Sequence, residues 1–66
     1  MKLDKCKIQV ILAEKEMNQS ELAIKIGANR QQVNEILSRG TCSLKTLGRI
    51  SKALNVPVSE IIKEDD

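Results

Sequence analysis

The side chains best suited to chemistry lie in one short segment, and they are hydrogen-bonding groups rather than nucleophiles. Asn29, Arg30, Gln31, Asn34 and Glu35 fall within seven consecutive positions. Arginine offers a fork of donors, asparagine and glutamine both donate and accept, and glutamate accepts. The segment therefore predicts a surface that recognises a polar partner through paired hydrogen bonds, not a centre that makes or breaks covalent bonds.

Catalytic and metal-binding chemistry lacks the side chains that it needs. The chain has no histidine and only two cysteines, Cys6 and Cys42, so one copy cannot assemble a four-ligand zinc site or a Cys–His pair. The two thiols fit either a disulfide or redox switch, or two partly buried thiols that an intracellular environment keeps reduced, and the second is favoured. We therefore expect no enzyme activity, no metal and no cofactor.

The length of the chain limits what it can enclose. Sixty-six residues suit one domain, and a chain of this size buries only about 60% of its unfolded surface. The sequence shows no signal peptide and no apolar run near the roughly 20 residues of a membrane span. We expect a single cytoplasmic domain over residues 1–66, with no membrane contact and no small-molecule ligand.

Charge is distributed unevenly. Residues 1–59 carry ten Lys or Arg against five Asp or Glu, a net +5, whereas residues 60–66 carry one lysine and four acids, a net −3, and the tail at about 63–66 is expected to fray. A basic body suits a polyanionic partner, although a solvated lysine surface gives the same excess. The chain has no aromatic residue to act as a stacking platform, so a nucleic-acid partner would be a duplex.

Periodicity and punctuation predict an all-α chain with five helices and no strand. The predicted helices cover about 3–16, a short stretch that begins at Asn18 to Ser20 and ends before Gly27, about 30–38, about 44–54, and a last short segment after Pro57. Ser20, Asn29 and Ser43 are suitable N-caps for the second, third and fourth helices. Gly27 can adopt the left-handed conformation that ends a helix.

Apolar spacing predicts the buried faces. The inward residues are expected to be Ile8, Ile11, Leu12, Leu22, Ala23, Ile26, Val33, Ile36, Leu37, Leu44, Leu47, Ile50 and Leu54. Gly48 interrupts the fourth helix at a cost of up to about 1 kcal/mol relative to alanine. Either a close backbone contact or tolerated sequence drift explains it.

The first helix carries a second apolar stripe. Leu3, Cys6, Val10 and Ala13 recur at spacings of three, four and three, which places them on roughly the opposite side from the inward residues. This face must meet the tail, another helix or another subunit, so it is a candidate surface for self-association.

Two short helices joined by a glycine turn are the pattern of a helix-turn-helix. In this sequence NQSELAIKIGANRQQVNEIL, followed by SLKTLGRISKALNVPVSEII, resembles the Cro/CI-type helix-turn-helix proteins of phage repressors and bacterial XRE-type regulators. The marks of the resemblance, which extends over about 8–62, are Gln19, Leu22-Ala23, Gly27, Val33, Ile36 and the closing Ala53-Leu54-Asn55-Val56. It implies a compact five-helix, lambda-repressor-like domain whose helix-turn-helix spans about 19–38.

The resemblance also implies a partner and contact residues. Family members bind operator DNA, commonly as a two-fold dimer, with the second helix of the motif in the major groove. Carried over by position, Asn29, Arg30, Gln31 and Glu35 would face base edges, and the helical periodicity adds Asn34 to that face. Phosphate contacts are expected from Asn18, Gln19, Ser38, Arg39 and Lys45.

The sequence departs from the family at one internal pair. Many members carry an arginine on the first helix and a glutamate on the third that form an ion pair, and the matching positions here are Leu12 and Leu37. An apolar pair can replace a buried ion pair without loss of stability. The fold is expected to tolerate this change.

These observations favour a sequence-specific, double-stranded DNA-binding transcriptional regulator that represses by occupying an operator as a homodimer. The alternative is a protein-interaction module of the same fold, such as an antitoxin-like partner, because fold alone does not define function.

Overall fold

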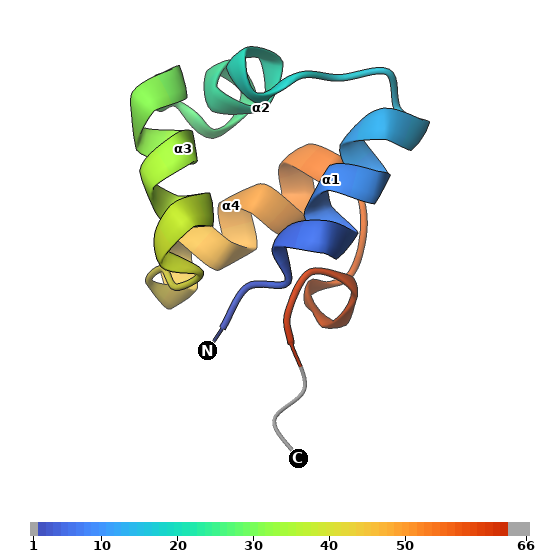
Figure 1. The fold of residues 1–66 in the computed structure, drawn as a ribbon, viewed down its shortest axis with the longest axis vertical. Helices are drawn as coiled ribbons and strands as arrows, with labels where there is room; N and C mark the ends of the chain where they lie inside the picture. Colours follow the sequence, from blue (N-terminus) through green and yellow to red (C-terminus); the bar gives the residue numbers. More distant parts are fainter. Residues whose placement is uncertain (1, 64–66) are drawn as a thin grey trace.

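The computed structural model describes residues 2–63 and folds them into four α-helices and one short 3-10 turn (Figure 1). The helices are α1 (Lys5–Glu14), α2 (Gln19–Ile26), α3 (Arg30–Arg39) and α4 (Leu44–Leu54), and the turn is η1 (Val58–Glu60). No strand occurs within residues 2–63, so the predicted all-α fold is confirmed. The predicted fifth helix is wrong in detail, because the chain after Pro57 makes a single 3-10 turn.

The first helix is shorter than predicted at both ends. Asp4 caps it, with a side-chain oxygen that accepts a hydrogen bond from the Lys7 N–H at 3.1 Å. Leu3 lies before the cap, where its N–H donates to the Gly40 carbonyl at 2.7 Å and its backbone pairs with that of Ile62. The helix ends at Glu14 because the chain turns sharply, and Glu16 has a φ of +55°.

The core lies where the four helices and the two ends of the described chain meet. Its buried residues are Leu3, Ile8, Leu12, Leu22, Ala23, Ile26, Val33, Leu37, Leu47, Ile50, Leu54 and Ile61. Leu12 and Leu37, which stand where family members carry an ion pair, are both in this core. The buried faces predicted for α2 and α3 agree with the structure, with Ile36 only partly buried.

The structure corrects one prediction about α4 and decides between the two explanations given for its glycine. Leu44 was expected to be buried but is 73% exposed, because it is the first residue after the Ser43 cap and the buried part of the helix starts one turn later at Leu47. Of the two explanations for Gly48, a close backbone contact is excluded, because a Cβ atom added there would meet no heavy atom within 4 Å outside the backbone of its own helix. The glycine is therefore not required by packing.

The N-terminal segment is hydrogen-bonded both to the end of α3 and to the segment after η1. The Asp4 N–H donates to the Ile61 carbonyl and the Lys63 N–H donates to the Lys2 carbonyl, each at 2.9 Å. Together with the bond from Leu3 to Gly40, these contacts place the N-terminal segment between the α3–α4 loop and the segment after η1. Lys63, the first residue of the tail that was predicted to fray, is therefore hydrogen-bonded to the N-terminal segment. The rest of that tail, 64–66, lies outside the described residues.

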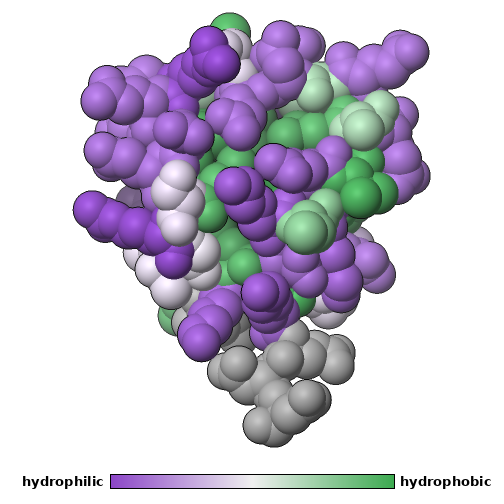
Figure 2. Space-filling model, in the orientation of Figure 1, coloured by the Kyte–Doolittle hydropathy of each residue, from purple (hydrophilic) through white to green (hydrophobic). Residues whose placement is uncertain are grey.

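The helices are arranged so that α3 and α1 lie on opposite sides of the domain, with α2 and α4 between them (Figure 1). Hydrophilic side chains cover the edge formed by α3, whereas apolar atoms show among polar ones where α1 lies (Figure 2). The two sides therefore present different surfaces to a partner.

Candidate nucleic-acid interface

The turn between α2 and α3 depends on one glycine. Gly27 has a φ of +72°, the left-handed conformation that L side chains rarely adopt. The next residue, Ala28, donates its N–H to the Ala23 carbonyl at 2.8 Å and so closes the end of α2. Only two residues, Ala28 and Asn29, then separate Gly27 from α3, and this short connection fixes the angle between the two helices.

Asn18, not Ser20 as predicted, is the N-cap of α2. Its side-chain oxygen accepts from the Glu21 N–H at 2.9 Å, and the Glu21 carboxylate accepts from the Asn18 N–H at 3.3 Å. This reciprocal capping box places Gln19 and Ser20 in the first turn of the helix. The first N–H groups of a helix carry partial positive charge, so this end is suited to an anion.

The same arrangement begins α3. The Asn29 side-chain oxygen accepts from the Gln32 N–H at 2.8 Å, and the Gln32 side-chain oxygen accepts from the Asn29 N–H at 3.0 Å. The predicted N-cap role of Asn29 is confirmed. While the oxygen accepts from Gln32, the amino group of this side chain is available to donate to a partner.

One edge of α3 is buried and the other faces solvent. Val33 and Leu37 anchor the helix in the core. The polar residues singled out in the sequence are all exposed: Asn29, Arg30, Gln31, Asn34, Glu35, Ser38 and Arg39. Residues three or four apart share a face of a helix, so these side chains form one continuous polar surface.

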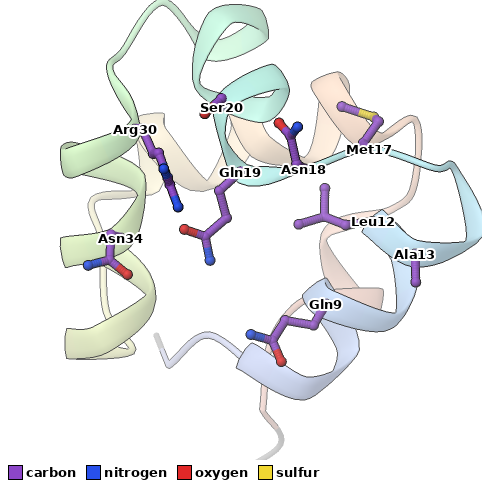
Figure 3. A pocket seen from close by; sticks show the side chains of 9 residues that line it. All are labelled: Gln9, Leu12, Ala13, Met17, Asn18, Gln19, Ser20, Arg30 and Asn34. Atoms are coloured by element: carbon purple, nitrogen blue, oxygen red, sulfur yellow. The ribbon is translucent and has the colours of Figure 1, made fainter.

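An open cleft of about 620 Å³ joins this surface to α1 and α2. Its lining residues are Gln9, Leu12, Ala13, Met17, Asn18, Gln19, Ser20, Arg30 and Asn34. Figure 3 shows the side chains of Gln19 and Arg30 extending toward each other across the space between α2 and α3, with Asn34 on the α3 side and Gln9 on the α1 side. Arg30 is the only ionised side chain in the lining, so the cleft is polar and weakly basic.

The cleft brings together only some of the residues singled out in the sequence. Asn18, Gln19, Arg30 and Asn34 line it. The others lie outside it: Asn29 at the start of α3, Gln31, Glu35, Ser38 and Arg39 further along the exposed surface of that helix, and Lys45 on the first turn of α4, also exposed. The candidate interface is therefore a polar helix edge with a cleft beside its first half.

Sequence reasoning missed the contribution of α1, and of the connection that follows it, to the cleft. Gln9 is exposed and Met17 partly buried, and both line it. No local signal could have identified them, because each faces the cleft only through the way α1 packs beside the start of α2.

Other kinds of site find no support in the part of the chain that the structure describes. No cluster of three or more histidine, cysteine or acidic side chains suited to a metal ion occurs among residues 2–63. Within the same residues no helix has the length and apolarity needed to cross a bilayer. The polar edge of α3 is thus the feature with a defined recognition chemistry.

Comparison with known proteins agrees with this geometry. A family model described as the Cro/C1-type HTH DNA-binding domain matches residues 7–65. Neither the curated proteins nor the solved structures gave a match. The family match extends over nearly the whole chain and includes both helices of the motif, the Gly27 turn and the exposed edge of α3. The chain therefore belongs to the family of Cro/C1-type helix-turn-helix DNA-binding domains.

Proposed function

We propose that this domain is a sequence-specific transcriptional regulator that binds operator DNA with α3 in the major groove and represses by occupying the site. The observation that carries the proposal is the orientation of α3. Val33 and Leu37 are held in the core, while Arg30 and Gln31 are exposed at the first turn of the helix. An α-helix fits the major groove, and helix-turn-helix proteins contact bases with the N-terminal residues of this helix.

The proposed base contacts follow from side-chain chemistry. Arg30 has the paired donors that match guanine O6 and N7, and Gln31 has the donor and acceptor that match adenine, each worth about 1 to 3 kcal/mol of discrimination. Asn29 and Asn34 are proposed as further contacts on the same side. A carboxylate placed against phosphate would be repelled. Glu35 is therefore proposed to accept from a cytosine amino group or to orient Arg30.

The proposed phosphate contacts surround these residues. Asn18 and Gln19 stand at the start of α2, where helix N–H groups attract an anion. Ser38 and Arg39 end α3, and Lys45 stands in the first turn of α4. Such contacts position a protein on the duplex but read no sequence directly, so a regulator needs both groups.

The proposal includes two copies on a two-fold operator. A single domain with one short reading helix covers few base pairs, and dimers of this motif contact half-sites about 34 to 36 Å apart, one turn of DNA. Each copy would then read one half-site with the same residues. The mechanism is occupancy of DNA, with no bond made or broken by the protein.

Selection of bound duplexes from a random pool tests this function directly. Enrichment of a sequence with two inverted half-sites is the expected result, and binding should weaken steeply with added salt. Binding to every duplex with equal affinity would remove sequence specificity from the proposal. If no duplex binds at any salt concentration, the domain is a protein-interaction module, such as an antitoxin-like partner, and α3 meets protein instead.

A further inference from the structure

The side of α1 that points away from the core is exposed and has a specific order of side chains. We call it the outer face of α1 and define it by Cys6, Lys7, Val10, Ala13 and Glu14, all of which are exposed. Val10 is 57% exposed, and among residues 2–63 it is one of three large apolar residues that are exposed. Leu3, predicted to extend this stripe, is buried in the core instead.

Val10 stands at the centre of this face. At 100° per residue, it projects nearly opposite the direction midway between Ile8 and Leu12, the buried residues of α1. On one flank of Val10 the helix carries Lys7 and Glu14, which line a groove of about 290 Å³ beside η1. The other flank carries Ala13, which lines the cleft between α1, α2 and α3.

We propose that the outer face of α1 is a dimer interface, on which the α1 of a second copy of this chain packs antiparallel about a two-fold axis that passes between the two Val10 side chains. This inference supplies the contact surface for the two-copy binding proposed above. It rests on the order of charges along the helix and on the position of the two flanks relative to the cleft.

Charge order favours the antiparallel arrangement. Lys7 is three residues before Val10 and Glu14 is four residues after it, about 4.5 and 6 Å along the helix axis. A two-fold axis perpendicular to the plane of the two antiparallel helices places each flank of one copy beside the same flank of the other. Lys7 of one copy therefore lies against Glu14 of the other, and this pair occurs twice. On the opposite flank, Cys6 of each copy lies near the small Ala13 of the other, which permits close approach.

The pairing of Lys7 with Glu14 distinguishes the antiparallel from the parallel arrangement. The groove is otherwise acidic, because Asp4 and Glu60 also line it and Lys7 is its one cation. The Asp4 carboxylate is engaged in capping α1. If the helices packed in parallel, Lys7 would lie opposite Cys6 and Glu14 opposite Ala13, leaving the acids without a compensating cation. Only the antiparallel register places each lysine against a carboxylate of the second copy.

The same symmetry points both DNA-reading surfaces in one direction. Because Ala13 belongs to the cleft that contains Gln19 and Arg30, the flank of α1 that carries it is the flank nearer the polar edge of α3. A two-fold axis that preserves this flank turns the two clefts to the same side of the dimer. This is the arrangement that an operator with two inverted half-sites requires.

A charge-exchange experiment without DNA tests the interface. The Lys7→Glu chain has only acids at positions 7 and 14, and the Glu14→Lys chain only lysines, so each is expected to weaken its own dimer about tenfold. Mixed in equal amounts, the two chains should form a heterodimer in which every pair at these positions is complementary. Sedimentation of each chain and of the mixture measures this, and failure of the mixture to associate more tightly than either chain alone would overturn the proposal.

Disulfide trapping tests the register. In a background of Cys6→Ser and Cys42→Ser, Val10→Cys should cross-link two copies under mild oxidation, because this position lies on the axis. Glu14→Cys in the same background is the matched control within α1, since the two equivalent positions are roughly 12 Å apart, beyond disulfide reach. Adding Lys7→Cys to Glu14→Cys should recover cross-linking, because positions 7 and 14 face each other between copies.

A further control separates specific packing from collision. Ile24 lies on α2 rather than α1 and is 78% exposed. The variant Ile24→Cys should cross-link no faster than Glu14→Cys. Equal trapping at 10, 14 and 24 would overturn the proposed interface. Association through α1 with no binding to any duplex would instead contradict the proposed function and leave the interface intact, so the two failures are distinguishable.

Discussion

Asn29 and Gln32 hold each other through two reciprocal hydrogen bonds, of 2.8 Å to the Asn29 side-chain oxygen and 3.0 Å to the Gln32 side-chain oxygen. This pair fixes the first turn of α3, from which Arg30 and Gln31 project. Since the bonds exist in the free domain, no order need be created there when a partner binds. The start of the proposed reading helix is thus preorganised.

Substitution at Asn29 should separate capping from DNA contact. Asn29→Ala removes the cap and should lower the free energy of unfolding by about 1 kcal/mol. Asn29→Asp keeps an equally good capping oxygen but replaces the free amino group with negative charge, so stability should be retained while duplex affinity falls. Thermal unfolding and binding titration measure the two effects. If Asn29→Asp binds DNA as tightly as wild type, this side chain does not face the duplex.

Arg30 and Gln31 should determine base preference. Replacement of either by alanine is expected to reduce discrimination at one operator position by about 1 to 3 kcal/mol, because a bidentate contact to a base edge is lost. Competition between the selected operator and single-base variants measures this. Equal loss of affinity for all duplexes would show that the residue contacts the backbone rather than a base.

Lys45 should contribute to affinity through charge alone. Lys45→Gln is expected to make the dependence of log K on log salt shallower by about one unit, with no change in base preference, because one fewer counterion is released. Lys52→Gln, also exposed and on the same helix, is the matched control. An identical change in both variants would indicate a general effect of net charge rather than a phosphate contact at Lys45.

Gly48→Ala should stabilise the domain. The added methyl group meets no atom within 4 Å, and alanine favours a helix interior over glycine by up to about 1 kcal/mol. Denaturant unfolding should show a higher midpoint with an unchanged slope. Gly27→Ala is the contrasting variant: space is equally open there, but the φ of +72° strains any L side chain, so stability should decrease.

The two thiols should differ in reactivity. Cys6 is exposed, whereas partial burial raises the pKa of the Cys42 thiol above its usual range. A raised pKa means that a smaller fraction of Cys42 is present as the reactive thiolate at a given pH. Alkylation at pH 8, followed by mass spectrometry, should therefore modify Cys6 first. The difference should disappear in denaturant, and its persistence there would rule out burial as the cause.

Local interactions explain what the sequence determined by itself. Interactions between residues at most four positions apart determine several local features: the left-handed Gly27, the N-caps Asn29 and Ser43, and the end of α4 at Asn55. The polar edge of α3 follows from helical spacing once Val33 is inward. A single sequence was therefore sufficient to predict the helix-turn-helix and the set of side chains that it exposes.

Packing between distant segments decided the rest. Leu3 fits the periodicity of α1 but is held away from that helix by a bond to Gly40, thirty-seven residues later in the chain. Leu44 fits the apolar stripe of α4 and is nonetheless exposed, because periodicity does not reveal where along a helix its neighbours end. Gln9 and Met17 join the cleft only because α1 lies beside the start of α2. Such contacts depend on how whole helices are placed in space, and no spacing along a single sequence encodes that placement.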